Sequence, residues 1–338
     1  MPLELTIVVP AFNEAHRLAE GVKRFDAAVS DGAVDVGRTE VLVIDDGSTD
    51  GTAETARALL THLPHHRVIS LPANRGKGAA VRTGVTHARG HYTAYMDADM
   101  AIDPRAIPRL IHGLGTHDLA IGSRALPDSM VESTYVIRSV MGRLFNRLVT
   151  TGTGLGLHDT QCGFKAFHTP VARLLFHLVR MDRFAFDVEM LERAHRLGLR
   201  ITEVPVHWRH VAGSTVHPLH DSVTMLVDVF SSRLGLRDAP VLPAVTVRPR
   251  PADGAGDLPD RVRAVVAAAT GDLPLPVVVD GPAVMVLFPL LDPADAALIH
   301  TALRAEMGST AQVTRSILTT GDLMALAPLA GRLEPPVG

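Results

Sequence analysis

The stretch VLVIDDGSTDG, Val41 to Gly51, has the form of a buried strand that runs into a helix. Its apolar run ends at two acids, and the next residues supply turn and N-cap chemistry for a helix around Ala53–Leu63. The same alternation recurs through the first half of the chain, which indicates α/β architecture with a mostly parallel sheet. The predicted strands are Leu5–Val9, Val41–Ile44, Arg67–Leu71, Tyr92–Met96 and Leu119–Gly122.

The composition is that of an ordinary globular protein. Among 338 residues, 20% are charged and the net charge is -3, so the basic surplus typical of a nucleic-acid-binding domain is missing. A single cysteine, Cys162, excludes an intrachain disulfide and a thiolate zinc cluster and fits a reducing compartment. We therefore expect a cytoplasmic protein without a nucleic-acid partner.

The hydropathy pattern predicts no membrane-spanning segment. The N-terminal stretch MPLELTIVVP lacks a basic region and is interpreted as a first strand, not a signal peptide. The most apolar window, Leu273–Leu291, is interrupted by Asp280 and four prolines, which a spanning helix tolerates poorly. An apolar stripe with arginines over Tyr135–Val149 fits either a membrane interface or packing on the sheet. A second helical candidate, Val223–Leu234, allows the same two interpretations.

The chain divides into three predicted parts. Residues 1–236 form the α/β domain, and residues 237–258, rich in Pro, Ala and Gly, are predicted as a linker. Residues 259–338 have the pattern helix, strand, strand, helix, strand, helix, which predicts a small α+β domain. No acidic pair or glycine loop marks that domain, so its function is not predicted.

Polar clusters follow four of the predicted strands: Asn13-Glu14, Asp45-Asp46, Asp97-Ala98-Asp99 and Ser123-Arg124. Ligands of such sheets bind outside the carboxyl ends of the strands, so the four clusters together predict one site. Asp45, at a strand tip, could bind a ribose or a base edge, whereas Asp46 belongs to the turn.

Asp97 and Asp99 are candidate ligands of Mg²⁺ or Mn²⁺, because two carboxylates with diphosphate oxygens and water can complete an oxygen shell. Asp103 before Pro104 is assigned instead to capping the next helix. The segment Asn74–Gly78 offers glycines and a helix start, where backbone amides could approach an anion, although on its own this pattern is better explained as an ordinary glycine turn.

Later segments supply further candidates. Asp187 and Glu189 lie in a predicted first helical turn, where acids are favoured anyway, and either could be a base. Around the cysteine, Cys162 is interpreted as a small buried residue and Lys165 as the functional one. Arg209, after the strand predicted over Ile201–Val206, is a possible anion ligand.

Eight motifs in order carry a resemblance over roughly residues 3 to 235: VVPAFNE, VIDDGSTDGT, NRGKGAAVRTG, MDAD, IGSR, DTQCGFKAF, FAFDVE and VPVHW. Together they resemble the family-2 inverting glycosyltransferases, above all the dolichyl- and polyprenyl-phosphate β-glucosyltransferases. The resemblance implies a GT-A fold, Rossmann-like as in nucleotide-diphospho-sugar transferases, with transfer of glucose from UDP-glucose to a polyprenyl monophosphate.

The resemblance also implies roles for individual residues. It assigns the uridine to Pro10, Phe12, Glu14 and Asp45. It assigns Lys77 to the uridine or its phosphates, and the metal and diphosphate to Asp97 and Asp99. Its candidates for the acceptor phosphate are Ser123, Arg124, Arg138 and Arg209.

The acceptor decides whether a base is needed. A phosphate monoester has a second pKa of about 6 and is already largely dianionic, so Arg124 and Arg209 need only orient it. A soluble or glycan hydroxyl acceptor would instead make Asp187 indispensable as a base.

The residues leave the donor and the partners open in part. The donor could be GDP-mannose or another UDP-sugar in place of UDP-glucose, and the chain could also be a non-catalytic nucleotide-sugar-binding protein. A lipid acceptor implies peripheral contact with the cytoplasmic face of a membrane. The sequence does not predict the oligomeric state.

Overall fold

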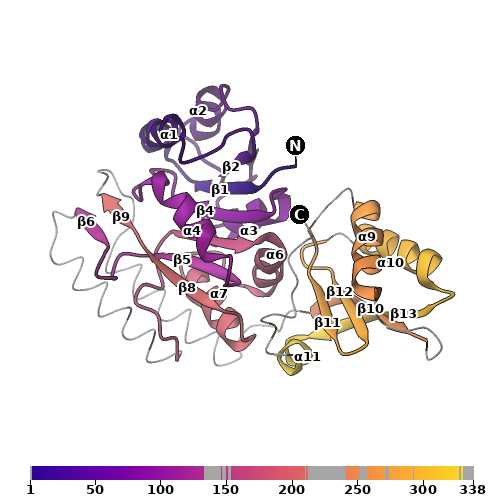
Figure 1. Ribbon diagram of the computed structural model, residues 1–338. Helices are drawn as coiled ribbons and strands as arrows, with labels where there is room; N and C mark the ends of the chain where they lie inside the picture. Colours follow the sequence, from indigo (N-terminus) through magenta and orange to yellow (C-terminus); the bar gives the residue numbers. More distant parts are fainter. Residues whose placement is uncertain are drawn as a thin grey trace.

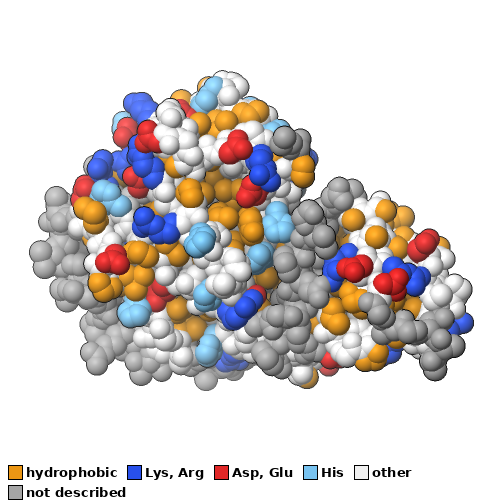
Figure 2. Space-filling view, in the orientation of Figure 1, with side chains coloured by type: hydrophobic (Ala, Val, Ile, Leu, Met, Phe, Trp, Pro, Cys, Tyr) orange, Lys and Arg blue, Asp and Glu red, His pale blue; other side chains and the backbone are white. Residues whose placement is uncertain are grey.

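The computed structural model describes residues 2–132, 146, 150, 154–209, 211, 241–250, 257–270, 274–291, 293–326 and 329. Figure 1 shows a larger unit built from the N-terminal part of the chain and a smaller one built from the C-terminal part. On the face drawn in Figure 2, acidic and basic side chains are interspersed over both units, in keeping with the small net charge. Within the described residues, no helix is both long and apolar enough to span a bilayer.

A sheet in the order β3-β2-β1-β4-β7-β5-β8 forms the centre of the larger unit. Its strands are β1 (Leu5–Ala11), β2 (Thr39–Asp45), β3 (His66–Ser70), β4 (Tyr92–Met96), β5 (Leu119–Ser123), β7 (Phe164–His168) and β8 (Ile201–Pro205). All neighbours are parallel except β7, which is antiparallel to both β4 and β5. The five strands predicted for the first half are confirmed, whereas β7 was not predicted.

Helices cover both faces of this sheet. They are α1 (Ala15–Ser30), α2 (Thr52–Leu59), α3 (Lys77–His87), the 3₁₀ turn η1 (Pro104–Ala106), α4 (Ile107–Gly113), α6 (Thr169–Leu178) and α7 (Phe186–Arg196). Val8 packs with α3, α6 and α7, while its neighbours Ile7 and Val9 pack with α1, α2 and α4. Because both faces are buried, the parallel strands appear in the sequence as continuous apolar runs.

A short parallel ribbon joins β6 (Met130–Glu132) to β9 (His207–Arg209) beside the sheet. Met130 and Val131 are exposed on it. The helix candidates Tyr135–Val149 and Val223–Leu234 lie outside the described residues, apart from Asn146.

The smaller unit contains β10 (Val241–Pro249), α9 (Leu258–Thr270), β11 (Val277–Asp280), β12 (Ala283–Leu287), α10 (Pro293–Met307), β13 (Ala311–Thr319) and α11 (Thr320–Ala325). Its antiparallel sheet has the order β11-β12-β10-β13, which is the ferredoxin-like β-α-β-β-α-β arrangement. The predicted order of helices and strands after residue 258 is confirmed. The prediction of a linker over residues 237–258 is wrong for β10, because those residues form an interior strand whose Pro243 lies outside the ladder with β12.

Both faces of this second sheet are buried. Val245 and Val247 of β10 pack with α9 and α10, whereas Leu242 and Ala244 belong to the buried cluster that includes α6 and α7. His177 at the end of α6 joins the two units: its Nε2 lies 2.7 Å from the Val241 carbonyl oxygen, and its Nδ1 accepts from the Leu290 amide at 3.2 Å. The small α+β region is therefore packed against the larger unit.

Candidate active site

The carboxyl ends of β2, β1 and β4 are neighbours in the sheet, so the polar segments that follow them meet. Two hydrogen bonds lock the first two segments together. The Asn13 amide donates to Ser48 Oγ at 2.9 Å, and Asn13 Oδ1 accepts from the Thr49 amide at 2.9 Å. Asn13 has a φ of 52°, which its short polar side chain tolerates. Three of the four predicted polar segments therefore follow neighbouring strands, whereas Ser123-Arg124 follows β5, which β7 separates from β4.

Asp46 holds the glycine loop Asn74–Gly78 in place. Its carboxylate accepts the backbone amides of Arg75 at 2.9 Å and Gly76 at 2.7 Å. The Ala79 amide in the first turn of α3 donates to the Asp182 carbonyl at 3.1 Å. The protein itself therefore satisfies the amides of Arg75, Gly76 and Ala79, as an ordinary glycine turn would. Asp45 is buried at the tip of β2 and accepts the Ser48 amide.

Asp97 and Asp99 follow β4, and each carboxylate is paired with a cation. Lys77 Nζ lies 2.7 Å from Asp97 Oδ1, and Arg17 pairs with Asp99. A Cβ on Gly163 would overlap the Asp97 carboxylate, so glycine there leaves room for it. Asp103 caps η1 by accepting the Arg105 amide at 3.0 Å, as predicted. Asp99 is therefore not needed as a helix cap.

Glu14 lies close to these acids, on the other side of Arg17. Arg17 Nη1 donates to Glu14 Oε1 at 2.6 Å. Burial raises the pKa of Glu14 to about 7, with Arg17 opposing the rise and Asp99 and Asp97 adding to it. Burial and the Asp97 charge also raise the pKa of Asp99. These three acids thus form a crowded negative cluster in which cations are favoured.

A second cluster lies beneath the first. Lys165 Nζ, which is fully buried, donates to Asp187 Oδ1 and to the Cys162 carbonyl, both at 2.6 Å, and Tyr95 donates its hydroxyl to Asp187. The prediction that Lys165 binds substrate is wrong for this arrangement, because its ammonium has no exposed surface. Cys162 is buried, as predicted, and burial raises the pKa of its thiol to about 12.

The candidates for the acceptor phosphate are engaged by different partners. Arg124 grips Asp159 with two nitrogens, at 2.7 and 3.0 Å, and Arg209 pairs with Glu132 on the β6–β9 ribbon at 2.9 Å. Ser123 is buried, and within the described residues its hydroxyl has no hydrogen-bond partner. Arg138 lies outside the described residues. Of the residues assigned to the uridine, Pro10 lies in β1 and Phe12 is partly exposed beyond its end.

The acids at the end of β4 fit a divalent cation that is completed by a substrate. Within the described part of the chain, no group of three His, Cys, Asp or Glu side chains is arranged to hold a metal ion by itself. Two aspartates with hard oxygen atoms nevertheless match the ligands of Mg²⁺ and Mn²⁺, which in phosphate-binding sites keep water and phosphate oxygens as further ligands. The Asp97 side chain is 45% exposed and therefore open to such a ligand.

Comparison with known proteins shows the family of the chain. A family model described as glycosyl transferase family 2 matches residues 6–176. Dolichyl-phosphate beta-glucosyltransferase of Dictyostelium discoideum is 36% identical over 243 residues, covering 68% of this chain and 73% of that protein. The Homo sapiens protein of the same name is 34% identical over 252 residues, covering 68% and 75%.

Among solved structures, glucosyl-3-phosphoglycerate synthase from Mycobacterium tuberculosis, in complex with Mn²⁺, UDP-glucose and phosphoglyceric acid, superimposes with a TM-score of 0.52. It is 22% identical, and the match covers 70% of this chain and 81% of that chain. The fold is therefore GT-A-like, and the family match makes the protein a sugar-transferring enzyme. The chain belongs to glycosyl transferase family 2.

Sequence reasoning missed Arg17, which contacts two of the acids, and Tyr95, which contacts Asp187. Arg17 lies three residues after Glu14, a spacing that brings side chains together on a helix, and this signal could have identified it. Tyr95 lies inside an apolar strand, where nothing in the sequence separates it from ordinary core aromatics.

Proposed function

We propose that this glycosyltransferase transfers glucose from UDP-glucose to a polyprenyl monophosphate. The names of the relatives support this acceptor class and this sugar. In the proposed reaction, an acceptor phosphate oxygen forms a bond to C1 of glucose while the bond from C1 to the UDP oxygen breaks. UDP leaves with the electron pair, and the configuration at C1 is inverted.

The observation that carries this proposal is that the Asp187 carboxylate already has partners within the protein. A hydroxyl acceptor needs a base within hydrogen-bond reach of its proton. The Asp187 carboxylate is buried and already engaged by Lys165 at 2.6 Å and by Tyr95. A phosphate acceptor needs no base, since its second pKa is about 6. The engaged Asp187 therefore favours a phosphate over a hydroxyl as the nucleophile.

Donor binding is assigned to the ends of β1, β2 and β4. Phe12, Glu14 and Asp45 would face the uridine, and Lys77 would neutralise phosphate charge. Asp97 and Asp99 would hold Mg²⁺ or Mn²⁺, which stabilises charge on the departing diphosphate when bound. Arg124 and Arg209 remain the proposed ligands of the acceptor phosphate, and with a lipid acceptor the protein would work at the cytoplasmic surface of a membrane.

The test supplies labelled UDP-glucose, UDP-GlcNAc or GDP-mannose with Mg²⁺ or Mn²⁺, and offers either a short polyprenyl phosphate or hydroxyl acceptors. The expected product is a polyprenyl phosphate glucose from UDP-glucose. In the Asp187→Asn protein, transfer per donor-loaded enzyme should fall far less than the roughly 10²–10⁴-fold that loss of a general base costs. Transfer only to hydroxyl acceptors, with loss of that size, would overturn the proposal.

A further inference from the structure

One face of α1 grips the segment that carries Asp97 and Asp99. Arg17, Gly21 and Arg24 recur at i, i+4 and i+7, so they lie on the same side of the helix. A Cβ on Gly21 would overlap the Ala98 carbonyl oxygen, and Arg24 donates to the Met100 carbonyl at 3.3 Å. The helix and the acidic segment are therefore in direct backbone contact.

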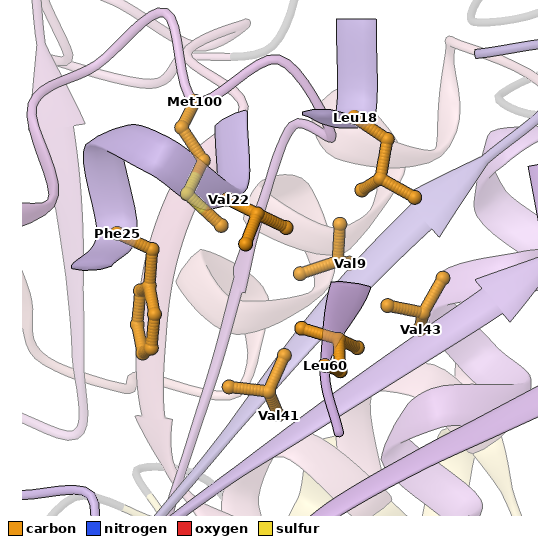
Figure 3. Close-up of a pocket in the computed structure, with 8 residues that line it drawn as sticks. All are labelled: Val9, Leu18, Val22, Phe25, Val41, Val43, Leu60 and Met100. Atoms are coloured by element: carbon orange, nitrogen blue, oxygen red, sulfur yellow. The ribbon is translucent and has the colours of Figure 1, made fainter. Parts of the chain in front are cut away.

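Met100, which follows Asp99, also holds this acidic segment against α1. It has a φ of 45°, a left-handed conformation that is uncommon for a long side chain. Figure 3 shows its side chain beside Val22 and Phe25 of α1, in a small apolar cavity that also involves β1 and β2. This burial holds the turn in place, so Asp99 keeps a fixed position relative to α1.

Both oxygens of Asp99 are engaged in this arrangement. Oδ1 accepts the Ala101 amide at 3.0 Å, and Oδ2 is the atom paired with Arg17. Arg17 also holds Glu14 Oε1, while Glu14 Oε2 and Arg17 Nε are buried and have no partner within the described residues. Arg17 thus supplies positive charge at the carboxylate where a divalent cation is proposed. Its own Nε and Glu14 Oε2 nevertheless lack hydrogen-bond partners within the described residues.

We propose that Arg17 is a resident counter-cation that competes with the divalent metal for Asp99. The inference rests on the metal site of the proposed function. Arg17 must leave Asp99 Oδ2 before this oxygen can ligate a metal, and that step exposes Asp99 and Glu14 to each other. Metal binding to the donor-free enzyme is weakened by this exchange, and UDP offsets the cost by bringing diphosphate oxygens as further ligands.

The test measures Mn²⁺ binding to the purified full chain by electron paramagnetic resonance, with no donor sugar or acceptor present. The Arg17→Met protein should bind Mn²⁺ about tenfold more tightly than the wild type. In this protein the metal no longer has to displace an arginine whose ion pair with Asp99 has the interaction energy of an ordinary close charge pair. Added UDP should then improve Mn²⁺ binding less in Arg17→Met than in the wild type. Arg17→Lys keeps a cation and should bind Mn²⁺ nearly as weakly as the wild type.

The matched control is Lys23→Met, which removes one positive charge from the same helix at a side chain that is 77% exposed. It should leave Mn²⁺ affinity unchanged. Equal or weaker Mn²⁺ binding by a folded Arg17→Met protein would overturn the proposal, as would equal tightening by Lys23→Met. If Arg17→Met does not fold, side-chain NMR of arginine in the wild type decides, because Mg²⁺ must shift the Arg17 signals as it binds. Neither readout depends on the acceptor, so failure here is separable from failure of the proposed transfer.

Discussion

At the scale of single residues, Asp99 is the acid on which metal-dependent chemistry should depend. Because Asp103 caps η1, replacing Asp99 removes no helix cap. We predict that Asp99→Ala abolishes metal-dependent sugar transfer while the protein still unfolds cooperatively. Product formation at increasing Mn²⁺ and a thermal melt together check this.

The control for that prediction is Asp103→Ala, which should cost about 1 kcal/mol of stability through the lost cap and retain metal-dependent transfer. Undiminished activity of Asp99→Ala would contradict the role assigned to this carboxylate.

Glu14 gives a pH dependence whose sign follows from its raised pKa. Its ordinary value is 4.5 and its value in the fold is about 7, so the folded state favours the protonated form. The stability this contributes is complete below the ordinary pKa and is lost as the pH rises through 7. We predict that the melting temperature of Glu14→Gln minus that of the wild type increases from pH 5 to pH 8. A difference that stays constant with pH would refute this.

Individual residues were predictable where their chemistry is local. The cap at Asp103 followed from its neighbour Pro104, and the burial of Cys162 followed from the usual behaviour of a free cysteine. Lys165 was misassigned because its partner Asp187 lies on another element, and no sequence pattern tells whether a lysine points into a site or into the core. A buried lysine is held there by pairing, which only the fold reveals.

At the scale of elements, the contact between α1 and the acidic segment depends on Gly21. In a helix interior, alanine is normally favoured over glycine by about 1 kcal/mol. At Gly21 the added Cβ would overlap the Ala98 carbonyl oxygen. We predict that Gly21→Ala destabilises the protein by about 1–3 kcal/mol, the usual cost of overpacking, and weakens Mn²⁺ binding. Urea unfolding and metal titration measure the two effects.

Gly156→Ala is the control for this substitution, since a Cβ at Gly156 would meet nothing within 4 Å. It should change neither stability nor Mn²⁺ affinity appreciably. A stabilised Gly21→Ala protein would mean that the close approach of α1 does not constrain the segment.

Most elements of the central sheet followed from their apolar runs, but β7 did not. Phe164–His168 interrupts its apolar residues with Lys165, and its strand character comes from pairing with β4 and β5 on either side. Such pairing joins residues that are far apart in the chain, so no local pattern records it. The same limit applies to β10, where two prolines and flanking glycines indicated a linker.

At the scale of the whole molecule, His177 joins the ferredoxin-like unit to α6. The Leu290 amide donates to Nδ1, so this nitrogen must be unprotonated, and Nε2–H donates to the Val241 carbonyl. Burial lowers the pKa of His177, the Val241 carbonyl opposes this, and Arg180 and Arg82 add to the lowering. Above the ordinary histidine pKa of about 6.5, the neutral His177 ring therefore stabilises the contact between the two units. This contribution is lost as the pH falls below that value.

We predict that acidification from pH 7.5 to 5.5 lowers the hydrogen-exchange protection factors, which correct for the pH dependence of intrinsic exchange, more in β10 and β12 than in β1 and β2. His177→Gln should reduce this pH dependence. An equal change of the protection factors in both units would argue against titration of His177 at the contact between them. The pairing of these units was beyond sequence reasoning, because the apolar side chains of β10 do not tell which partner covers each face.

The antiparallel strand β7 has a consequence for how the chain is made. β4 and β5 do not pair with each other; β7 lies between them. During synthesis, β1 to β4 can pair with one another as soon as they emerge, since these pairings join only residues before 97. The other edge of β4 waits for β7. β5 must wait for Phe164–His168 before it joins the sheet, so the half assigned to the donor can form on the ribosome before the half assigned to the acceptor. A nascent chain halted ahead of β7 would therefore leave β5 unpaired and prone to aggregate.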